Sequence, residues 1–296
     1  VVAPDSFKGS LTSAEVADAV ERGIKDVFPQ CNVVKAGVAD GGEGTVEAIV
    51  KAVGGDMYAA SVTDPLGRPV KAAYGIVRSG GVKTAVMEMS AASGLPLLLP
   101  DELNPWITST YGTGEMISDA LNRGCRKFLV GIGGSATNDA GTGMLSALGV
   151  RFLDSRGQRL KGCGRDLKSI ARIDMSSLMP AARESEFIVA CDVNTPFCGP
   201  DGAARVFAPQ KGADPQTAEA LDRGMRSFAR VIAGQFQTDI VPLSGAGAAG
   251  GLGGAFKAFL NARLTAGIEM VLDAIAFDSL LEGASLVITG EGRIDA

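Results

Sequence analysis

An α/β fold is the prediction for this chain, and three patterns lead to it. Short apolar runs end in glycine-rich or acidic loops and lead into segments with apolar residues at helical spacing, as in residues 126–149. Residues 1–55 hold two such strand, loop and helix units in succession, which predicts parallel strands. Residues 70–76 carry apolar side chains at alternate positions between turn signals, which predicts antiparallel strands. A length of 296 residues favours two domains, and the change of pattern places a boundary near residue 60.

The first unit begins with a buried strand at residues 1–3 and a loop at residues 4–10. Thr12 and Glu15 have the spacing of a capping box, so a helix should begin there, and Pro29 should end it. The apolar face of this helix is expected to consist of Val16, Val20, Ile24 and Val27.

The second unit repeats the plan, with a strand at Val33–Val34 and a loop at residues 39–44. Its helix should run from about Val46 to Val53 and stop at the glycine pair of residues 54–55. Later segments predict further elements: helices over residues 110–124 and after Asp214-Pro215, and buried strands at residues 128–130, 187–190 and 286–289.

Composition limits the kinds of partner. The net charge is −5 and no cluster of lysine or arginine occurs, which argues against a nucleic-acid surface and favours a small-molecule substrate. No apolar run approaches the roughly 18 residues of a membrane span. Five cysteines without metal-type spacing indicate reduced thiols, so we expect a cytoplasmic protein without membrane contact. A homo-oligomer stays open.

The chain contains no histidine. The commonest general base and every His-containing metal site are therefore excluded. Acid–base chemistry and metal binding must fall to aspartate and glutamate.

A glycine loop at residues 131–134 follows an apolar strand and precedes a helical segment. Glycines allow the backbone to approach a phosphate closely, and a following helix directs unpaired N–H groups at an anion. The hydroxyls of Ser135 and Thr137 and the carboxylate of Asp139 would lie near that phosphate or its metal. The competing interpretation is a tight turn between two core elements.

The kind of nucleotide loop is only partly specified. A Walker loop needs Gly-Lys followed by Ser or Thr, and the dipeptide Gly-Lys does not occur in the chain, so that class is excluded. The glycines at 131 and 133 with Ala136 satisfy a loose dinucleotide fingerprint, and Asp154 follows a second strand-like run at residues 150–153. An NAD-dependent dehydrogenase of a small hydroxy acid is therefore the alternative.

A second glycine run spans residues 244–254 and also precedes a helical segment. The sequence allows two interpretations equally, a second phosphate cradle or a helix start packed too closely for side chains.

Carboxylates follow four of the apolar strands, at the strand ends where open α/β sheets bind ligands. A set of acids with basic neighbours suits metal-assisted phosphoryl transfer, in which acids hold Mg²⁺ and orient a hydroxyl while cations balance phosphate charge. Any one of these acids alone would be interpreted as a helix cap or a solvated loop residue. The four groups are Asp5 with Lys8, Asp40 with Glu43, Asp192 with Asn194, and Glu291 with Arg293 and Asp295.

These loops carry a resemblance to the bacterial glycerate kinase type-1 family, which spans the whole chain. The motifs that carry it are APDSFKG (residues 3–9), VADGGEGT (38–45), GIGGSATND (131–139), ACDV (190–193), PQKGA (209–213) and ITGEGRID (288–295). The resemblance implies phosphorylation of D-glycerate with ATP and Mg²⁺, commonly to 2-phosphoglycerate.

The resemblance also implies how the two α/β domains are connected. A discontinuous parallel-sheet domain would comprise residues 1–60 plus 286–296, and a second α/β domain with a mixed sheet would be inserted as residues 61–285. It further implies a C-terminal segment that this sequence lacks.

We assign roles within these motifs by chemistry. Asp192, Lys8 and Asp295 are the expected catalytic residues, and Ser6, Asp40, Glu43, Arg293 and Glu291 are expected to bind substrate. Gly131, Gly133, Gly134, Ser135 and Thr137 should bind the nucleotide, and Asp192 and Asp139 the metal. Because parallel strands with right-handed crossovers place their loops on one edge, we expect Lys8, Asp40, Glu43, Arg293 and Asp295 to share one cleft. A non-catalytic binder of an anionic metabolite is the third hypothesis.

Overall fold

The structure, a computed structural model, describes residues 1–7, 9–39, 41–42, 44–79 and 81–292. Its strands are β1 (Val2–Pro4), β2 (Gly55–Thr63), β3 (Pro69–Ser79), β4 (Val82–Glu88), β5 (Lys127–Gly131), β6 (Arg151–Leu153), β7 (Arg172–Asp174), β8 (Glu186–Ala190), β9 (Arg263–Thr265) and β10 (Ile288–Gly290). Its α-helices are α1 (Ser13–Val27), α2 (Thr45–Val53), α3 (Ser90–Ser93), α4 (Tyr111–Asn122), α5 (Thr142–Ala147), α6 (Pro180–Arg183), α7 (Ala203–Phe207), α8 (Pro215–Phe236), α9 (Ala248–Leu260), α10 (Gly267–Ala274) and α11 (Phe277–Leu281). Short 3₁₀ helices are η1 (Leu95–Leu97), η2 (Pro100–Glu102), η3 (Gly164–Ser169) and η4 (Pro209–Lys211).

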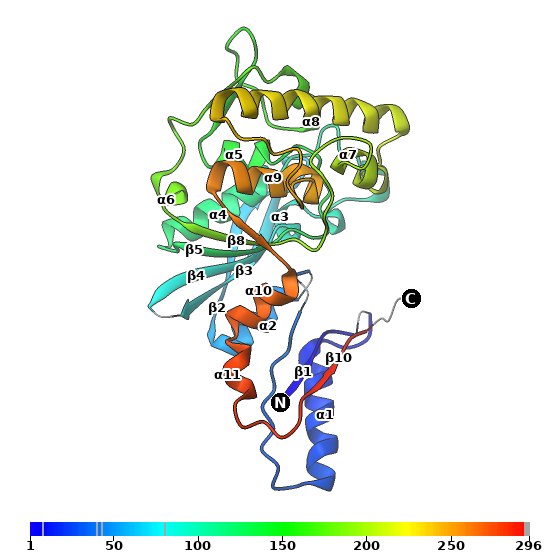
Figure 1. Cartoon of the computed structure of the whole chain (residues 1–296), viewed down its shortest axis with the longest axis vertical. Coiled ribbons are helices and arrows are strands. Elements are labelled where there is room, and N and C mark those ends of the chain that lie inside the picture. Colours follow the sequence, from blue (N-terminus) through cyan, green and yellow to red (C-terminus); the bar gives the residue numbers. More distant parts are fainter. Residues whose placement is uncertain (8, 40, 43, 80, 293–296) are drawn as a thin grey trace.

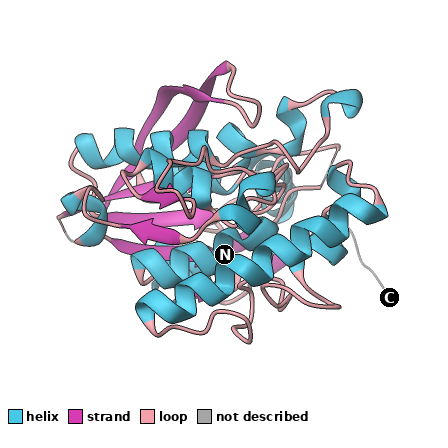
Figure 2. Ribbon diagram, turned by 90° about the horizontal axis from the view of Figure 1, so that it is seen from above, coloured by secondary structure: helices cyan, strands magenta, loops and turns pink. Residues whose placement is uncertain are grey.

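The largest sheet of the described residues has six strands in the order β2-β3-β4-β5-β8-β9. The strands β2, β3 and β4 are antiparallel neighbours, whereas β4, β5, β8 and β9 run parallel. The predicted α/β class and the antiparallel segment at residues 70–76 are both confirmed. Helices lie across this sheet when it is viewed from above (Figure 2).

Alternation along the strands gives the sheet an apolar core on each face. In β5, Phe128 and Val130 belong to one core, which α4, α5, α8 and α9 cover, and Leu129 belongs to the other. In β8, Ile188 likewise faces α2 and α10 while its neighbours face the larger core. Since both faces are covered, residues 128–130 of β5 and 187–190 of β8 are apolar without a break, as expected of parallel strands.

The two ends of the chain pair with each other. Strands β1 and β10 are parallel partners, and Figure 1 shows them with α1 at the end of the molecule away from the six-stranded sheet. The segment at residues 34–38 bonds along the other side of β1, but only Lys35 forms a bridge, so the predicted strand at Val33–Val34 is not a regular one. The domain boundary near residue 60 stays a prediction, and β2 runs through it.

Helix caps read from the sequence are present. Thr12 and Glu15 form the reciprocal capping box of α1, and the Asp214 side chain accepts a bond from the Thr217 N–H at the start of α8. The longest helix, α8, buries Leu221 and Met225 against the larger core. Among the described residues, no helix is long and apolar enough to cross a membrane.

Candidate functional site

Four parallel strands end in one row at an edge of the six-stranded sheet. Glu88 of β4 pairs with Gly131 of β5, Gly131 with Ala190 of β8, and Ala190 with Thr265 of β9. The loops that follow these residues therefore leave the sheet side by side, at the edge where α/β proteins bind ligands. This edge is the candidate site.

The loop before α2 lies over the middle of this row. A Cβ placed on Gly41 would lie 2.6 Å from the Cβ of Ala190 and 3.0 Å from the Cα of Gly267, and Gly41 has a positive φ of 85°. A Cβ placed on Gly131 would overlap the carbonyl oxygen of Gly41. Only glycine fits at both positions, so the two glycine motifs of the sequence meet at the candidate site.

Within the described residues, the tip of the glycine loop is open. Gly133 and Gly134 are exposed, and the atoms nearest to a Cβ on them would be the Gly42 Cα at 4.0 Å and the Ser90 Cβ at 3.6 Å. Gly131, by contrast, is buried against Gly41. Of the three glycines predicted to bind nucleotide, two thus leave room for a ligand beside their backbone, and their role stays a prediction.

Asp139 lies fully buried between the glycine loop and α5. Its carboxylate accepts bonds from the N–H and Oγ1 of Thr110 at 2.7 and 2.8 Å, and from the N–H groups of Gly141 and Gly143 at 3.1 and 3.2 Å. Burial raises the pKa of Asp139, while these bonds act in the opposite direction. The chain's own carboxylate therefore occupies the start of α5, where the sequence analysis expected a bound phosphate. The expected metal role of Asp139 is untested, and both carboxylate oxygens already have donors.

Lys211 is the residue of this region that sequence reasoning missed. It is 1% exposed, and its ammonium donates to Ser135 Oγ and to the Thr137 carbonyl oxygen at 2.6 Å each. Burial lowers the pKa of Lys211 to about 7, against the charge of Asp139, which acts to raise it. The available signal was the motif at residues 209–213, in which a lysine precedes a glycine and an alanine.

The loop that Lys211 contacts also contains buried polar atoms that lack a hydrogen-bond partner among the described residues. Thr137 Oγ1 and Asn138 Oδ1 are buried and make no hydrogen bond within the described residues, although both residues belong to the glycine loop motif. Buried polar groups are normally satisfied, so such exceptions tend to occur where function requires them.

Asp192 follows β8 at the same edge and is exposed. Its Oδ1 accepts a bond of 2.8 Å from the N–H of Gly267, the first residue of α10. The start of α10 thus fixes one oxygen of this carboxylate. Within the described residues, the second carboxylate oxygen of Asp192 accepts no hydrogen bond, so that oxygen is available to a ligand.

Hydrogen bonds to the residues around Asp192 fix the rest of its loop. Ser244 Oγ donates to the Asn194 side-chain oxygen at 2.7 Å, and the thiol of Cys191 donates to the Val193 carbonyl oxygen at 3.3 Å. Burial raises the pKa of the Cys191 thiol, which disfavours a reactive thiolate.

A Mg²⁺ ion suits part of this donor set. The described residues contain no group of three or more Asp, Glu, Cys or His side chains that would enclose a metal. Mg²⁺ commonly needs only one or two carboxylates, because water and phosphate oxygens complete its shell. Asp192, with one oxygen fixed and the other available, fits that requirement better than Asp139.

The remaining predicted residues lie near the β1/β10 pair or outside the described part of the chain. The backbone N–H of Ser6 donates to the Asp5 carboxylate at 2.6 Å, just after β1, and Glu291 is exposed directly after β10. Ser6 and Glu291 thus follow strands that pair Pro4 with Gly290. Five predicted residues lie outside the described residues, so their meeting in one cleft stays a prediction: Lys8, Asp40, Glu43, Arg293 and Asp295.

The second glycine run is filled by protein. A Cβ on Gly247 would overlap the Pro196 carbonyl oxygen, and one on Gly250 would overlap that of Thr137. Gly251 is closed off by Met225 and Phe197, at 2.8 and 2.9 Å from its virtual Cβ. Of the two interpretations, the structure therefore favours the closely packed helix start.

The dinucleotide alternative lacks its ribose-binding acid. Residues 151–153 do form a strand, β6, but this strand pairs antiparallel with β7 in a separate sheet. Asp154 accepts bonds from Arg156 and Gln158 within its own turn. A dinucleotide fold needs that acid at the end of the neighbouring parallel strand, so the geometry disfavours this alternative.

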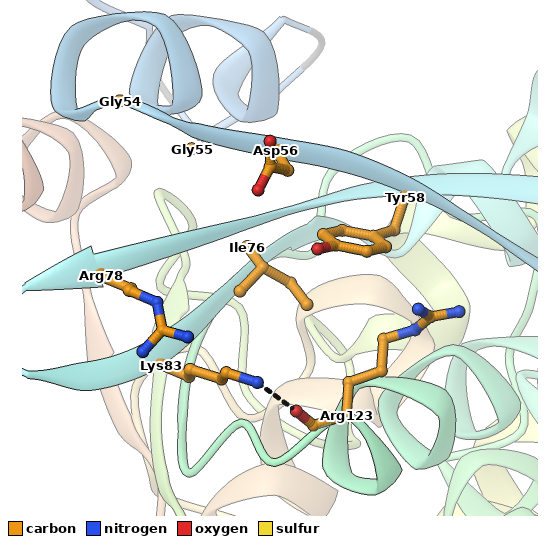
Figure 3. Close-up of a pocket in the computed structure, with 8 residues that line it drawn as sticks. All are labelled: Gly54, Gly55, Asp56, Tyr58, Ile76, Arg78, Lys83 and Arg123. Carbon is orange, nitrogen blue, oxygen red and sulfur yellow. Dashed lines mark hydrogen bonds between the residues drawn. The ribbon is translucent and has the colours of Figure 1, made fainter.

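A hollow of about 430 Å³ lies at the opposite edge of the sheet, where β4 begins (Figure 3). The Lys83 ammonium donates to the Arg123 carbonyl oxygen at 2.9 Å within it. Its described lining residues are Gly54, Gly55, Asp56, Tyr58, Ile76, Arg78, Lys83 and Arg123. None of them belongs to the glycine loop or to the Asp192 loop, so this hollow is distinct from the candidate site.

Comparisons with known proteins agree on one family. A profile of the glycerate kinase family matches residues 1–296. The glycerate kinase of Haemophilus influenzae is 49% identical over 296 residues, which cover 100% of this chain and 78% of that protein. The glycerate 2-kinase of Escherichia coli K12 is 47% identical over 296 residues, covering 100% of this chain and 77% of that protein.

A solved structure shares the fold. The crystal structure of a candidate glycerate kinase 2 from Salmonella typhimurium LT2 superposes with a TM-score of 0.95 at 46% identity. The match covers 99% of this chain and 78% of that one.

Proposed function

Since the chain belongs to the glycerate kinase family, we propose that it transfers the γ-phosphoryl group of ATP to D-glycerate and forms 2-phosphoglycerate. The chain is thereby a phosphotransferase with an alcohol group as acceptor. In the proposed reaction, a glycerate hydroxyl oxygen bonds to the γ-phosphorus, the bond from that phosphorus to the β–γ bridging oxygen breaks, and the hydroxyl proton is released.

One observation carries the proposal. The glycine loop follows β5 and the Asp192 loop follows β8, and these paired strands end at the same edge of the sheet. The open tip of the first loop and the available oxygen of Asp192 therefore lie at that edge. A phosphate beside Gly133 and Gly134 would therefore lie close to a carboxylate. Phosphoryl transfer depends mainly on such positioning and on compensation of charge.

We assign the roles accordingly. Gly133 and Gly134, with Ser135 and Thr137 behind them, would border the nucleotide phosphates, and Asp192 would hold Mg²⁺ or orient the substrate hydroxyl. When bound, Mg²⁺ would neutralise charge on the phosphate oxygens. In this proposal Asp139 supports the loop rather than the metal, because its oxygens are occupied by backbone and hydroxyl donors.

The substrate would bind towards the β1/β10 pair. Ser6, Glu291 and, outside the described part of the chain, Asp40, Glu43 and Arg293 are proposed to bind glycerate. Lys8 and Asp295, also outside the described residues, are proposed as catalytic residues together with Asp192. The proposed domain division is residues 1–60 plus 286–296 and residues 61–285. The planar guanidinium group of Arg293 would bind the glycerate carboxylate. A cytoplasmic location is part of the same proposal.

A coupled ADP-release assay over a panel of small hydroxy acids tests the function. We expect Mg-ATP with D-glycerate to release ADP, and product analysis to give 2-phosphoglycerate. NAD with the same acids should give no change in absorbance at the nicotinamide band. Thermal stabilisation by glycerate without turnover would instead support the non-catalytic binder.

A further inference from the structure

Lys211 carries a buried cation, and its hydrogen bonds within the described residues go to the loop after β5. The described residues place no carboxylate within ion-pair distance of its ammonium, and its hydrogen-bond acceptors are Ser135 Oγ and the Thr137 carbonyl oxygen. Asp139 acts on it only through its charge. The lysine thus ties together two points of one loop across 76 and 74 residues of sequence.

A neutral donor would serve a purely architectural role better. Two neutral acceptors are satisfied by an amide or a hydroxyl, and neither would bring the desolvation penalty of an unpaired ammonium. A buried cation becomes favourable when an anion comes close to it. The loop that Lys211 holds is the one that we propose to border nucleotide phosphates.

The two hydrogen bonds from Lys211 also limit the conformational freedom of the loop tip. Gly133 and Gly134 lie between the end of β5 and Ser135, and no side chain of their own restricts their backbone. Glycine loses more conformational entropy on ordering than any other residue. Bonds from Lys211 to Ser135 and Thr137 fix the far end of this tip before a ligand arrives.

We propose that Lys211 is a positioning residue for the nucleotide: it fixes the loop through Ser135 and Thr137 and supplies the buried positive charge that a phosphate beside Gly133 and Gly134 compensates. This inference rests on the proposed kinase function and deepens it. Lys211 acts through the loop, and no contact between Lys211 and the nucleotide is required.

The surroundings of Lys211 make its charge measurable. Among the described residues, Asp139 is the titratable group that acts on it. Arg205, the charged residue of the packed helix α7, has its Nε 4.0 Å from Oδ2 of Asp222 in α8. Asp214 is engaged as the cap of α8. An approaching phosphate favours the protonated lysine, so nucleotide binding should take up protons above pH 7 and weaken as pH rises through that value.

ADP with Mg²⁺ is the probe, with its affinity and proton uptake measured by calorimetry in two buffers from pH 6.5 to 8.5. Lys211→Met keeps the aliphatic stem and removes the charge. We expect its Kd for ADP to rise on the order of tenfold at pH 6.5 and the ratio to the unmodified protein to shrink towards pH 8.5. The KM for glycerate should stay within about twofold. The exposed Lys161→Met is the matched control and should leave both quantities unchanged.

The nucleotide's own phosphates titrate in this range, so the difference in proton uptake between the unmodified protein and Lys211→Met is the decisive quantity. Equal affinity and equal proton uptake in the two proteins overturn the inference while the kinase function stands. A parallel loss of ADP and glycerate affinity with a lower Tm, and no difference in uptake, also overturns it.

Two further measurements cover the case in which Lys211→Met does not fold. Ser135→Ala should weaken ADP binding without changing the KM for glycerate, and the unmodified protein should take up more protons on binding than free ADP accounts for. Failure of either result contradicts the inference. If the unmodified protein releases no ADP with glycerate, the proposed function itself is wrong.

Discussion

The two glycine-rich runs, at residues 131–134 and 244–254, look alike in sequence and differ in what occupies the space beside their backbones. In the first run, Gly133 and Gly134 border open space, whereas the backbone and side chains of the protein fill the positions beside Gly247, Gly250 and Gly251. The first run therefore has room for a ligand and the second has none. A glycine motif shows that something approaches the backbone closely, and only the fold shows whether that is a ligand or the protein itself.

The two runs are also in contact. Gly250 lies against Thr137 and Asn138, and the N–H of Ala140 donates to the Gly250 carbonyl oxygen at 3.0 Å. Three successive residues, Ala249 to Gly251, have left-handed backbone angles at this point, which breaks α9. The second run thus supports the first, and a substitution in the second run should act on stability, whereas one at the tip of the first run should act on ligand binding.

The largest effect is expected for Gly250→Ala. Its φ is +68° and the added Cβ would overlap the Thr137 carbonyl oxygen, so we expect a loss of about 4 kcal/mol in the free energy of unfolding. Urea denaturation measures it. Gly23→Ala in the middle of α1, where nothing lies within 4 Å, is the control and should stabilise the protein by about 0.5–1 kcal/mol. Equal unfolding curves for Gly250→Ala and the unmodified protein would contradict the packed interpretation.

The second effect concerns the loop between the two runs. Asp192→Asn keeps the shape of the side chain and removes its charge, and we expect kcat to fall on the order of a thousandfold, about 4 kcal/mol, with little change in Tm. Asn194→Ala, which removes the bond from Ser244 in the same loop, is the comparison variant and should lower kcat far less. A fully active Asp192→Asn variant would remove Asp192 from the proposed chemistry.

Local pattern was enough to predict much of the fold. The capping residues Thr12, Glu15 and Asp214 act on backbone within three residues, and the alternation in β3 reflects burial on one face of a sheet. Such interactions depend on spacing alone, which the sequence displays. The predicted strand at Val33–Val34 is not regular, because the apolar character of a short segment does not show how many of its residues pair. Here the segment pairs at one bridge, Val2 with Lys35.

The site was less predictable because its decisive contacts join distant residues. Asp139 is satisfied by Thr110, 29 residues earlier, and Lys211 reaches Ser135 across 76 residues. Nothing local distinguishes a buried lysine from the more usual exposed one. The meeting of Gly41 with Gly131 likewise requires knowledge of the strand order.

A third effect should appear in the pH dependence of stability. The unfolded chain keeps Lys211 protonated up to its ordinary pKa of 10.5, whereas the folded protein loses that proton near pH 7. The unfolded state therefore binds more protons between these values, and the free energy of unfolding should rise by up to about 1.4 kcal/mol per pH unit from this group. Lys211→Met should lack this component, as the difference between the two proteins' urea midpoints from pH 7 to 9 will show. A constant difference over this range would mean that Lys211 keeps its ordinary pKa.

The smallest effect separates the open and closed positions within the first run itself. Among the described residues, a Cβ on Gly133 would meet nothing closer than the Gly42 Cα at 4.0 Å, whereas one on Gly131 would overlap the Gly41 carbonyl oxygen. Gly133→Ala should therefore change the free energy of unfolding by less than about 0.5 kcal/mol, while a phosphate that needs the bare backbone should bind on the order of fivefold more weakly. Gly131→Ala should instead destabilise the fold and disturb glycerate and ATP alike, because it separates the two loops. Chemical denaturation and the KM values for ATP and glycerate measure all three quantities. If Gly133→Ala raises both KM values equally, the open tip is a turn that both substrates merely border, and the nucleotide must contact the protein elsewhere.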